Sequence, residues 1–252
     1  MALRLLAILA LLIGAGQSVR GQDMVFSTSD RIVWIHSNFA GETITLFGNI
    51  EPDIAGERPR GSYDVVVLIR GPVGERVVRR KSRQFGVMLN ADYALFTGLP
   101  SFYRVLSSRP LSTILDPDVL RERAFTVEAR VSQALTNTTG NVPLFEGELI
   151  RLMQDASLFA TAQRGVTFLS PTLFVTRVSL PANVPNGVFL AHALVVQDGQ
   201  IVAERTQRFF VQKTGFERFL GEASRNQPLL YGLACVLLAL VTGWLGGVLF
   251  RR

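Results

Sequence analysis

Cysteine and histidine are scarce in this sequence. Its 252 residues include a single cysteine, Cys235, and two histidines, His36 and His192. One cysteine excludes an internal disulfide framework, and two histidines without a cysteine set or a nearby carboxylate pair make a poor metal site. We therefore predict no metal and no cofactor, and we interpret both histidines as ordinary residues of β-strands.

Catalytic and phosphate-binding motifs are also missing. No G-x-S-x-G elbow, G-x-x-x-x-G-K loop or G-x-G-x-x-G turn occurs, so neither nucleophilic catalysis nor nucleotide binding has a local signature. Carboxylates for a glycosidase-like pair are present, but no spacing selects two of them. These carboxylates are Glu42, Glu51, Asp53 and Asp64. The sequence therefore predicts no catalytic residue, and an enzyme would have to depend on one of the two histidines.

Charged residues make up only 18% of the chain, and the net charge of +6 comes largely from its ends. Four arginines lie outside residues 22–227, whereas all 20 acidic residues lie inside. Removing these four from 26 basic residues leaves 22, so the body carries a net charge of about +2. This is an ordinary surface, and we predict no nucleic-acid partner.

One basic cluster stands out within the body. It consists of Arg76, Arg79, Arg80, Lys81 and Arg83. Such a cluster binds anionic lipid headgroups or an acidic partner, or it is the solvated side of a pair of strands. The sequence leaves these interpretations open.

The two ends of the chain are strongly apolar. Residues 1–21 place Arg4 before the apolar run Leu5–Ala15 and small residues after it, which is typical of a cleaved signal peptide. An uncleaved anchor is the alternative. Residues 229–250 contain no charge and are long enough to span a bilayer as one helix. With an exported body, the terminal residues 251–252, both arginines, remain in the cytoplasm, as the positive-inside rule expects.

The predicted span has a stripe of small residues. Cys235, Ala239, Gly243 and Gly247 recur at every fourth position, so they lie along one face of a helix. A stripe of this kind lets a second helix approach closely in lipid. We predict pairing with an integral membrane protein or with a second copy of the chain, although glycine is also common in membrane helices generally.

Between its apolar ends the chain is mainly β, and we predict an immunoglobulin-like antiparallel sandwich with a helical insertion. Short β-branched and aromatic runs such as Ile44–Ile50 and Tyr63–Arg70 alternate with glycine turns. Helical spacing predicts helices over Arg121–Leu135 and Leu144–Ala162, and Asp198-Gly199 predicts a hairpin turn. The predicted segments are 1–21, signal peptide; 22–110, β-sandwich-like; 111–165, helical insertion; 166–213, β-rich; 214–228, juxtamembrane; 229–250, span; and 251–252, cytoplasmic end.

A segment with aromatic and arginine residues lies between Pro100 and Pro110. It includes Phe102, Tyr103, Arg104 and Arg109, a composition that is common at protein interfaces. Two interpretations are open: exposed aromatic rings in a loop that contacts a partner, or a loop held in place by its own aromatic residues.

Several longer motifs carry a family resemblance. They are SYDVVVLIRGP (62–72), VRRK (78–81), LPSFYRVLSSRPL (99–111), LFVTRVSLPANVPNG (173–187) and the YG…GW span (231–244). The chain resembles the alphaproteobacterial predicted transmembrane proteins of unknown function over nearly its whole mature length. It departs from that family at Phe189, where a tyrosine is expected. The resemblance implies the bacterial inner membrane and no established activity.

Together these patterns predict a single-pass inner-membrane protein with a β-rich periplasmic body and a cytoplasmic C-terminus. We expect a non-enzymatic accessory or interaction subunit of a membrane complex, such as a transport complex. The alternative is a membrane-tethered periplasmic module that binds a ligand through its loops.

Overall fold

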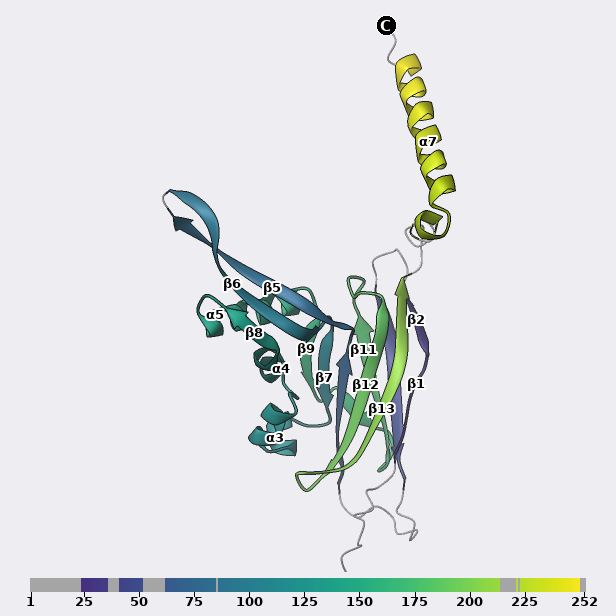
Figure 1. Cartoon of the computed structure of the whole chain (residues 1–252). Coiled ribbons are helices and arrows are strands. Elements are labelled where there is room, and N and C mark those ends of the chain that lie inside the picture. The colour runs from purple at the N-terminus through teal and green to yellow at the C-terminus, as the bar shows by residue number, and fades with distance from the viewer. Residues whose placement is uncertain are drawn as a thin grey trace, which may run out of the picture.

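The computed structural model describes residues 24–35, 41–51, 62–84, 86–213, 221 and 223–249. In this part of the chain, two β-sheets pack against each other, helices lie beside the larger sheet, and a long hairpin projects from the body (Figure 1). The predicted signal peptide 1–21, the predicted cytoplasmic end 251–252 and His36 lie outside the described residues.

The smaller of the two packed sheets has four strands, all paired antiparallel. Its spatial order is β1 (Met24–Thr28), β3 (Glu42–Ile50), β11 (Leu173–Leu180) and β10 (Val166–Phe168). Buried and exposed residues alternate along β3 from Ile44 to Ile50, with only Thr45 half-buried, as expected for a sheet with one face on the core.

The larger sheet has six strands. Its spatial order is β2 (Ile32–Ile35), β13 (Gln200–Lys213), β12 (Gly187–Gln197), β4 (Asp64–Arg70), β7 (Tyr103–Ser107) and β9 (Phe159–Gln163). The inner pairs are antiparallel, but the β2–β13 and β7–β9 pairs at the two edges are parallel. The predicted antiparallel pairing thus holds for the inner strands of this sheet and not at its two edges, where strands distant in sequence pair.

A third sheet is built on a hairpin. It contains β5 (Val73–Gln84), β6 (Val87–Pro100) and the short strand β8 (Leu135–Thr138). β8 pairs with β6 only at Ala94–Phe96, so the far half of the hairpin pairs only with itself. Gly86, with φ of 84°, lies at the turn, where a left-handed conformation favours glycine.

Helices fill the chain between β7 and β9. They are α2 (Leu111–Ile114), α3 (Pro117–Glu122), α4 (Val127–Ala134) and α5 (Val142–Asp155). The side chains of Asp116, Thr126 and Asn141 cap the starts of α3, α4 and α5 by accepting hydrogen bonds from backbone N–H groups of the first helical turn. α4 and α5 contact β9 and β6, and α4 also contacts β7, so this layer covers the side of the large sheet that faces away from the small sheet (Figure 1).

The observed helices α4 and α5 are shorter than the helices that the sequence pattern predicted. The pattern over Arg121–Leu135 breaks at Ala124, and the pattern over Leu144–Ala162 breaks at Ser157; both residues have positive φ. After each break, two backbone N–H groups bond back to the last turn, which closes the helix. The chain then enters β9 at Phe159, which pairs in parallel with Tyr103 of β7 at the edge of the large sheet.

One continuous core lies between the layers. Phe26 and Phe174 stack in the small sheet at a centroid distance of 6.2 Å, and Phe189 packs on Phe209 in the large sheet at 5.5 Å. The mainly β prediction with a helical insertion is confirmed. The immunoglobulin-like arrangement stays a prediction.

Gly48 brings the backbone of β3 close to this core. A Cβ there would lie 2.4 Å from Cζ of Phe174 and 2.9 Å from the carbonyl oxygen of Val25. We expect Gly48→Ala to lower the free energy of unfolding by roughly 1–3 kcal/mol, because the methyl group overpacks the sheet. Urea unfolding of the detergent-solubilised chain measures this loss. Gly74→Ala is the control, since a Cβ at Gly74 meets nothing within 4 Å; equal losses in the two variants would contradict the prediction.

Candidate interaction surfaces

The C-terminal helix α7 (Pro228–Leu249) is the first candidate surface. Residues Pro228–Val248 have a mean hydropathy of 2.1 and none of this stretch is buried against the rest of the described chain (Figure 1). It is the one helix among the described residues that is long and apolar enough to cross a membrane. The predicted span at 229–250 thus forms a helix within one residue of its predicted bounds.

The small-residue stripe on α7 is uncovered. Cys235 is exposed, and a Cβ built at Gly243 or Gly247 meets nothing within 4 Å. Ala239 occupies the intervening turn of the same face and is also exposed. The described body therefore leaves this face open to a second helix, and helix pairing stays a prediction.

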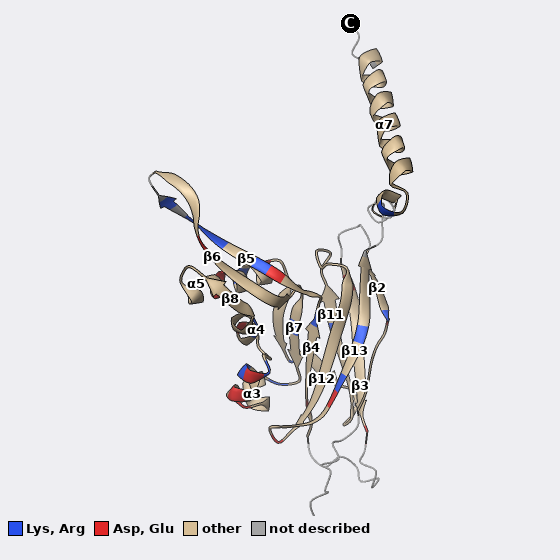
Figure 2. Cartoon of the chain, in the orientation of Figure 1, with Lys and Arg blue, Asp and Glu red and all other residues tan. Residues whose placement is uncertain are grey.

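The basic cluster forms one strand of the projecting hairpin. Arg76, Arg79, Arg80, Lys81 and Arg83 are all exposed on β5, and they run outward from the root toward the tip (Figure 2). Arg80 forms an ion pair of 3.1 Å with Asp92 on β6. No acidic residue occurs from Arg76 to Ala91, so the outer half of the hairpin is uniformly basic.

Apolar side chains surround the same tip, a feature that sequence reasoning missed. Val87, Met88 and Leu89 are 60%, 59% and 48% exposed. The available signal was the run Val-Met-Leu placed directly across a glycine turn from a basic strand. From sequence alone such a run predicts an ordinary half-buried strand, because the pattern does not show that no other element packs over it.

A second exposed apolar group lies on the large sheet. Ile32 on β2, Phe210 on β13 and Val188 on β12 occupy one row of the register, and each is more than 40% exposed. We call these three residues the apolar row. Its member Phe210 lies three residues before Lys213, so the row is at the end of the sheet from which the chain continues toward α7.

The interpretation of residues 102–109 as an exposed aromatic loop is wrong. Phe102 and Tyr103 are fully buried, and β7 is an interior strand of the large sheet. The Tyr103 hydroxyl donates a hydrogen bond to the carbonyl oxygen of Ala124 in the helical layer. Burial raises the pKa of Tyr103 above its usual range, so the hydroxyl stays protonated.

The two arginines of this segment also make internal contacts. Arg104 donates from Nη1 to the carbonyl oxygen of Ser179 in β11 at 3.1 Å, and its guanidinium lies 5.4 Å from the Phe102 ring centroid. Tyr103 is hydrogen-bonded to the helical layer, and its neighbour Arg104 is hydrogen-bonded to the small sheet. Adjacent residues of β7 therefore connect the large sheet to the layers on its two faces. The interface composition is therefore that of an internal junction between three layers.

Arg109 completes an ion pair at the start of β4. Its Nε donates to Oδ1 of Asp64 at 2.8 Å, its Nη2 donates to Oδ2, and the Ser108 hydroxyl donates to Oδ1 at 2.9 Å. The hydrogen bonds from Arg109 hold the pKa of Asp64 below its usual value, against the opposing effect of burial. These contacts connect the start of β4 with the end of β7.

His192 lies in a small polar group on the large sheet. Its Nε2 is 3.1 Å from Oε2 of Glu204, and Arg123 approaches Oε1 of the same carboxylate at 3.3 Å. Burial lowers the pKa of His192, and Glu204 offsets only part of this effect. The histidine has an ordinary structural partner, and among the described residues no group of three or more potential ligands is placed to hold a metal ion.

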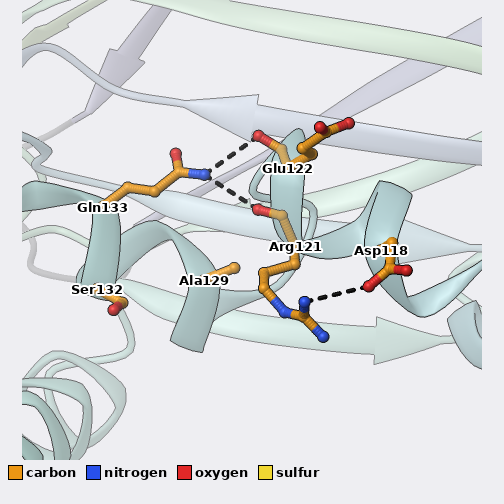
Figure 3. Close-up of a pocket in the computed structure, with 6 residues that line it drawn as sticks. All are labelled: Asp118, Arg121, Glu122, Ala129, Ser132 and Gln133. Atoms are coloured by element: carbon orange, nitrogen blue, oxygen red, sulfur yellow. Dashed lines mark hydrogen bonds and ion pairs between the residues drawn. The ribbon is translucent and has the colours of Figure 1, made fainter.

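An open polar pocket of about 600 Å³ lies between α3 and α4 (Figure 3). Three of its polar side chains already have partners: Arg121 pairs with Asp118 at 3.1 Å, and Gln133 donates to the carbonyl oxygens of Arg121 and Glu122. Few groups remain to orient a ligand. The pocket gives little support to a ligand-binding function.

The fold and these surfaces define a β-rich body with one apolar helix that is long enough to anchor it in a bilayer. A family model described as "Putative transmembrane protein (Alph_Pro_TM)" matches residues 23–252, and the chain belongs to that family. The resemblance inferred from the sequence motifs is confirmed, and the chain is a membrane protein with one candidate span among its described residues.

Other comparisons add little. No curated protein sequence matches the chain. A solved structure described as "Structural basis of T cell specificity and activation by the bacterial superantigen toxic shock syndrome toxin-1" is similar to 76% of this chain and to 100% of that chain. The identity is 9% and the TM-score is 0.26, so this similarity supports no statement about fold or function.

The junction at Tyr103 is testable by deleting one atom. We expect Tyr103→Phe to lower the free energy of unfolding by about 1–2 kcal/mol, because the buried Ala124 carbonyl loses its partner. Urea unfolding of the detergent-solubilised chain measures the change. Tyr93→Phe, at an exposed tyrosine, is the control. A loss at position 103 no larger than the loss at position 93 would contradict the junction.

The Asp64 ion pair predicts a pH dependence of stability. Because its pKa is depressed in the folded chain, Asp64 contributes stability above its unfolded pKa, and this contribution is lost as pH falls through the folded pKa. We expect Asp64→Asn to destabilise the chain by on the order of 1 kcal/mol near neutral pH, and less in acid. Thermal unfolding from pH 7 down to strongly acidic pH measures the difference. Glu148→Gln, at an exposed ion pair, serves as the control; a difference at position 64 that is independent of pH would refute the assignment.

Proposed function

We propose that this chain is a non-enzymatic accessory or interaction subunit of a membrane complex, such as a transport complex. Its body lies in the periplasm, its span lies in the inner membrane, and its C-terminus is cytoplasmic. The observation that carries this proposal is the uncovered stripe of Ala239, Gly243 and Gly247 on α7.

The physical argument for a partner starts from the lipid environment. Two apolar helices gain nothing from hydrophobic burial in lipid, so they associate where small residues let their backbones pack closely. The stripe supplies four consecutive turns of such positions, and the described body does not occupy them. A helix of another subunit or of a second copy fits this face.

The position of the apolar row supports the same role. Ile32, Phe210 and Val188 are exposed at the end of the large sheet from which the chain continues toward the span. A partner with a membrane helix and an extramembrane portion is able to contact α7 and this row together. Sequence supports the orientation, since residues 251–252 are both arginine and would be retained on the cytoplasmic side.

The stripe is tested by bulky substitutions. We expect Gly243→Leu combined with Gly247→Leu to weaken association by more than about tenfold, because the leucines hold the helices apart. Affinity purification from native membranes in mild detergent, followed by native mass spectrometry, measures both the size and the composition of the complex.

The control is Ala234→Leu, which places a leucine on the opposite face of α7. Nine residues separate Ala234 from Gly243, and at about 100° per residue this places the two on opposite faces. Loss of a polytopic protein only in the glycine variant supports an accessory subunit, and loss of a dimer supports self-association. Complexes of unchanged size in both variants would refute helix pairing.

A further inference from the structure

The outer half of the β5–β6 hairpin is built unlike the rest of the body. From Lys81 to Asn90 the two strands pair only with each other, because β8 joins β6 nearer the root. The described side chains of this part are exposed, including large apolar ones. An isolated two-stranded ribbon in water is marginally stable, so a contact at the tip would stabilise it.

The apolar side chains of the tip face in opposite directions. Met88 is paired with Arg83 and shares one face of the ribbon with it, whereas Leu89 is paired with Ser82 and lies on the other face. Val87, one position from Met88, also faces away from it. A groove on a folded protein covers one face of a ribbon. A fluid bilayer interface surrounds both faces at once, so it matches this arrangement better.

The charge of the tip matches anionic headgroups. The basic cluster contributes five cations, and Asp92 pairs with the cation at Arg80. The long aliphatic stems of Arg and Lys lie along apolar surface while their charged ends reach polar groups. Apolar residues at the turn and cations behind them are the order that is expected at a headgroup boundary.

The hairpin leaves the body at the same end of the large sheet from which the chain continues toward α7. At its root, a Cβ on Gly187 would lie 2.6 Å from Cγ of Pro72, and Gly187 pairs with Val211 near the end of β13. β5 and the exit toward α7 therefore share one end of the large sheet. Twelve residues of β5 extend about 40 Å, and the tip lies beyond that end of the sheets (Figure 1).

We propose that the tip of the β5–β6 hairpin docks on the anionic surface of the same bilayer that α7 spans. Val87, Met88 and Leu89 enter the interfacial region, and Arg79, Lys81 and Arg83 contact lipid phosphates. The body is then held at two points, which sets its orientation over the membrane. This inference goes beyond the proposed function and holds whether or not α7 binds a partner.

The test places an environment-sensitive fluorophore at the tip of the full-length chain. In a Cys235→Ala background, Met88→Cys carries the label, and Gln200→Cys carries it in the control, at the exposed far end of β13. Each protein is reconstituted in nanodiscs of phosphatidylcholine alone or of phosphatidylcholine with phosphatidylglycerol. A blue shift of emission and quenching by a lipid-borne nitroxide report insertion.

We expect the probe at position 88, and not the probe at position 200, to shift and be quenched in the anionic discs. Reversing three charges, with Arg79→Glu, Lys81→Glu and Arg83→Glu, should weaken docking on the order of a hundredfold. Circular dichroism confirms that this variant retains its fold. Emission at position 88 that matches position 200 in both lipids overturns the proposal.

Two further outcomes also decide the matter. Equal insertion in both lipids that survives charge reversal overturns recognition of anionic headgroups. A shift that requires a co-purified protein, and is absent with purified chain in anionic discs, assigns the tip to an acidic partner and overturns lipid docking. Neither result bears on the glycine stripe, so this proposal and the proposed function fail separately.

Discussion

The rest of the structure depends on the need to cover both faces of β4. Residues Val65–Ile69 are apolar without interruption and at most 3% exposed, so neither face of this strand is able to meet water. The small sheet contacts β4 through β10, and the helical layer between β7 and β9 contacts the neighbouring strands β7 and β9. Tyr103 and Arg104 hold these layers from adjacent positions of β7, one bonded to each side. The mainly β body thus needs its helical insertion to complete its core.

This layered core also sets where the interaction surfaces lie. Since β4 and β13 run toward the same end of the large sheet, the hairpin that follows β4 and the chain that leaves β13 emerge together. Buried apolar residues form one core, and in the described pocket Arg121 pairs with Asp118 while Gln133 bonds backbone carbonyl oxygens. Exposed apolar residues with a basic surround remain at the hairpin tip, and an uncovered apolar helix follows the body. The proposed interaction role and the proposed lipid docking rest on these exposed apolar surfaces.

Sequence patterns predicted the elements whose signals are local. The span, the Asp198-Gly199 hairpin and the strands predicted at Ile44–Ile50 and Tyr63–Arg70 follow from apolar length, turn residues and β-branched runs. The helix ends at Ala124 and Ser157 were missed, because neither residue is a glycine and only the packed neighbourhood stabilises their positive φ. The segment around Tyr103 was assigned to the surface, because aromatic and arginine residues have the same composition in an interface and in an internal junction.

The sequence by itself determined that the chain has an uncharged helix of membrane-spanning length, a β-rich body without disulfides and a basic strand, since hydropathy, cysteine count and charge are properties of short segments. Only the tertiary structure decided which aromatic residues are buried, which edge strands pair in parallel and which apolar residues remain uncovered. These outcomes depend on contacts between residues far apart in the chain, as between Asp64 and Arg109 or Arg104 and Ser179. Whether a residue is buried depends on which distant segments pack against it, and a local sequence pattern does not identify those segments.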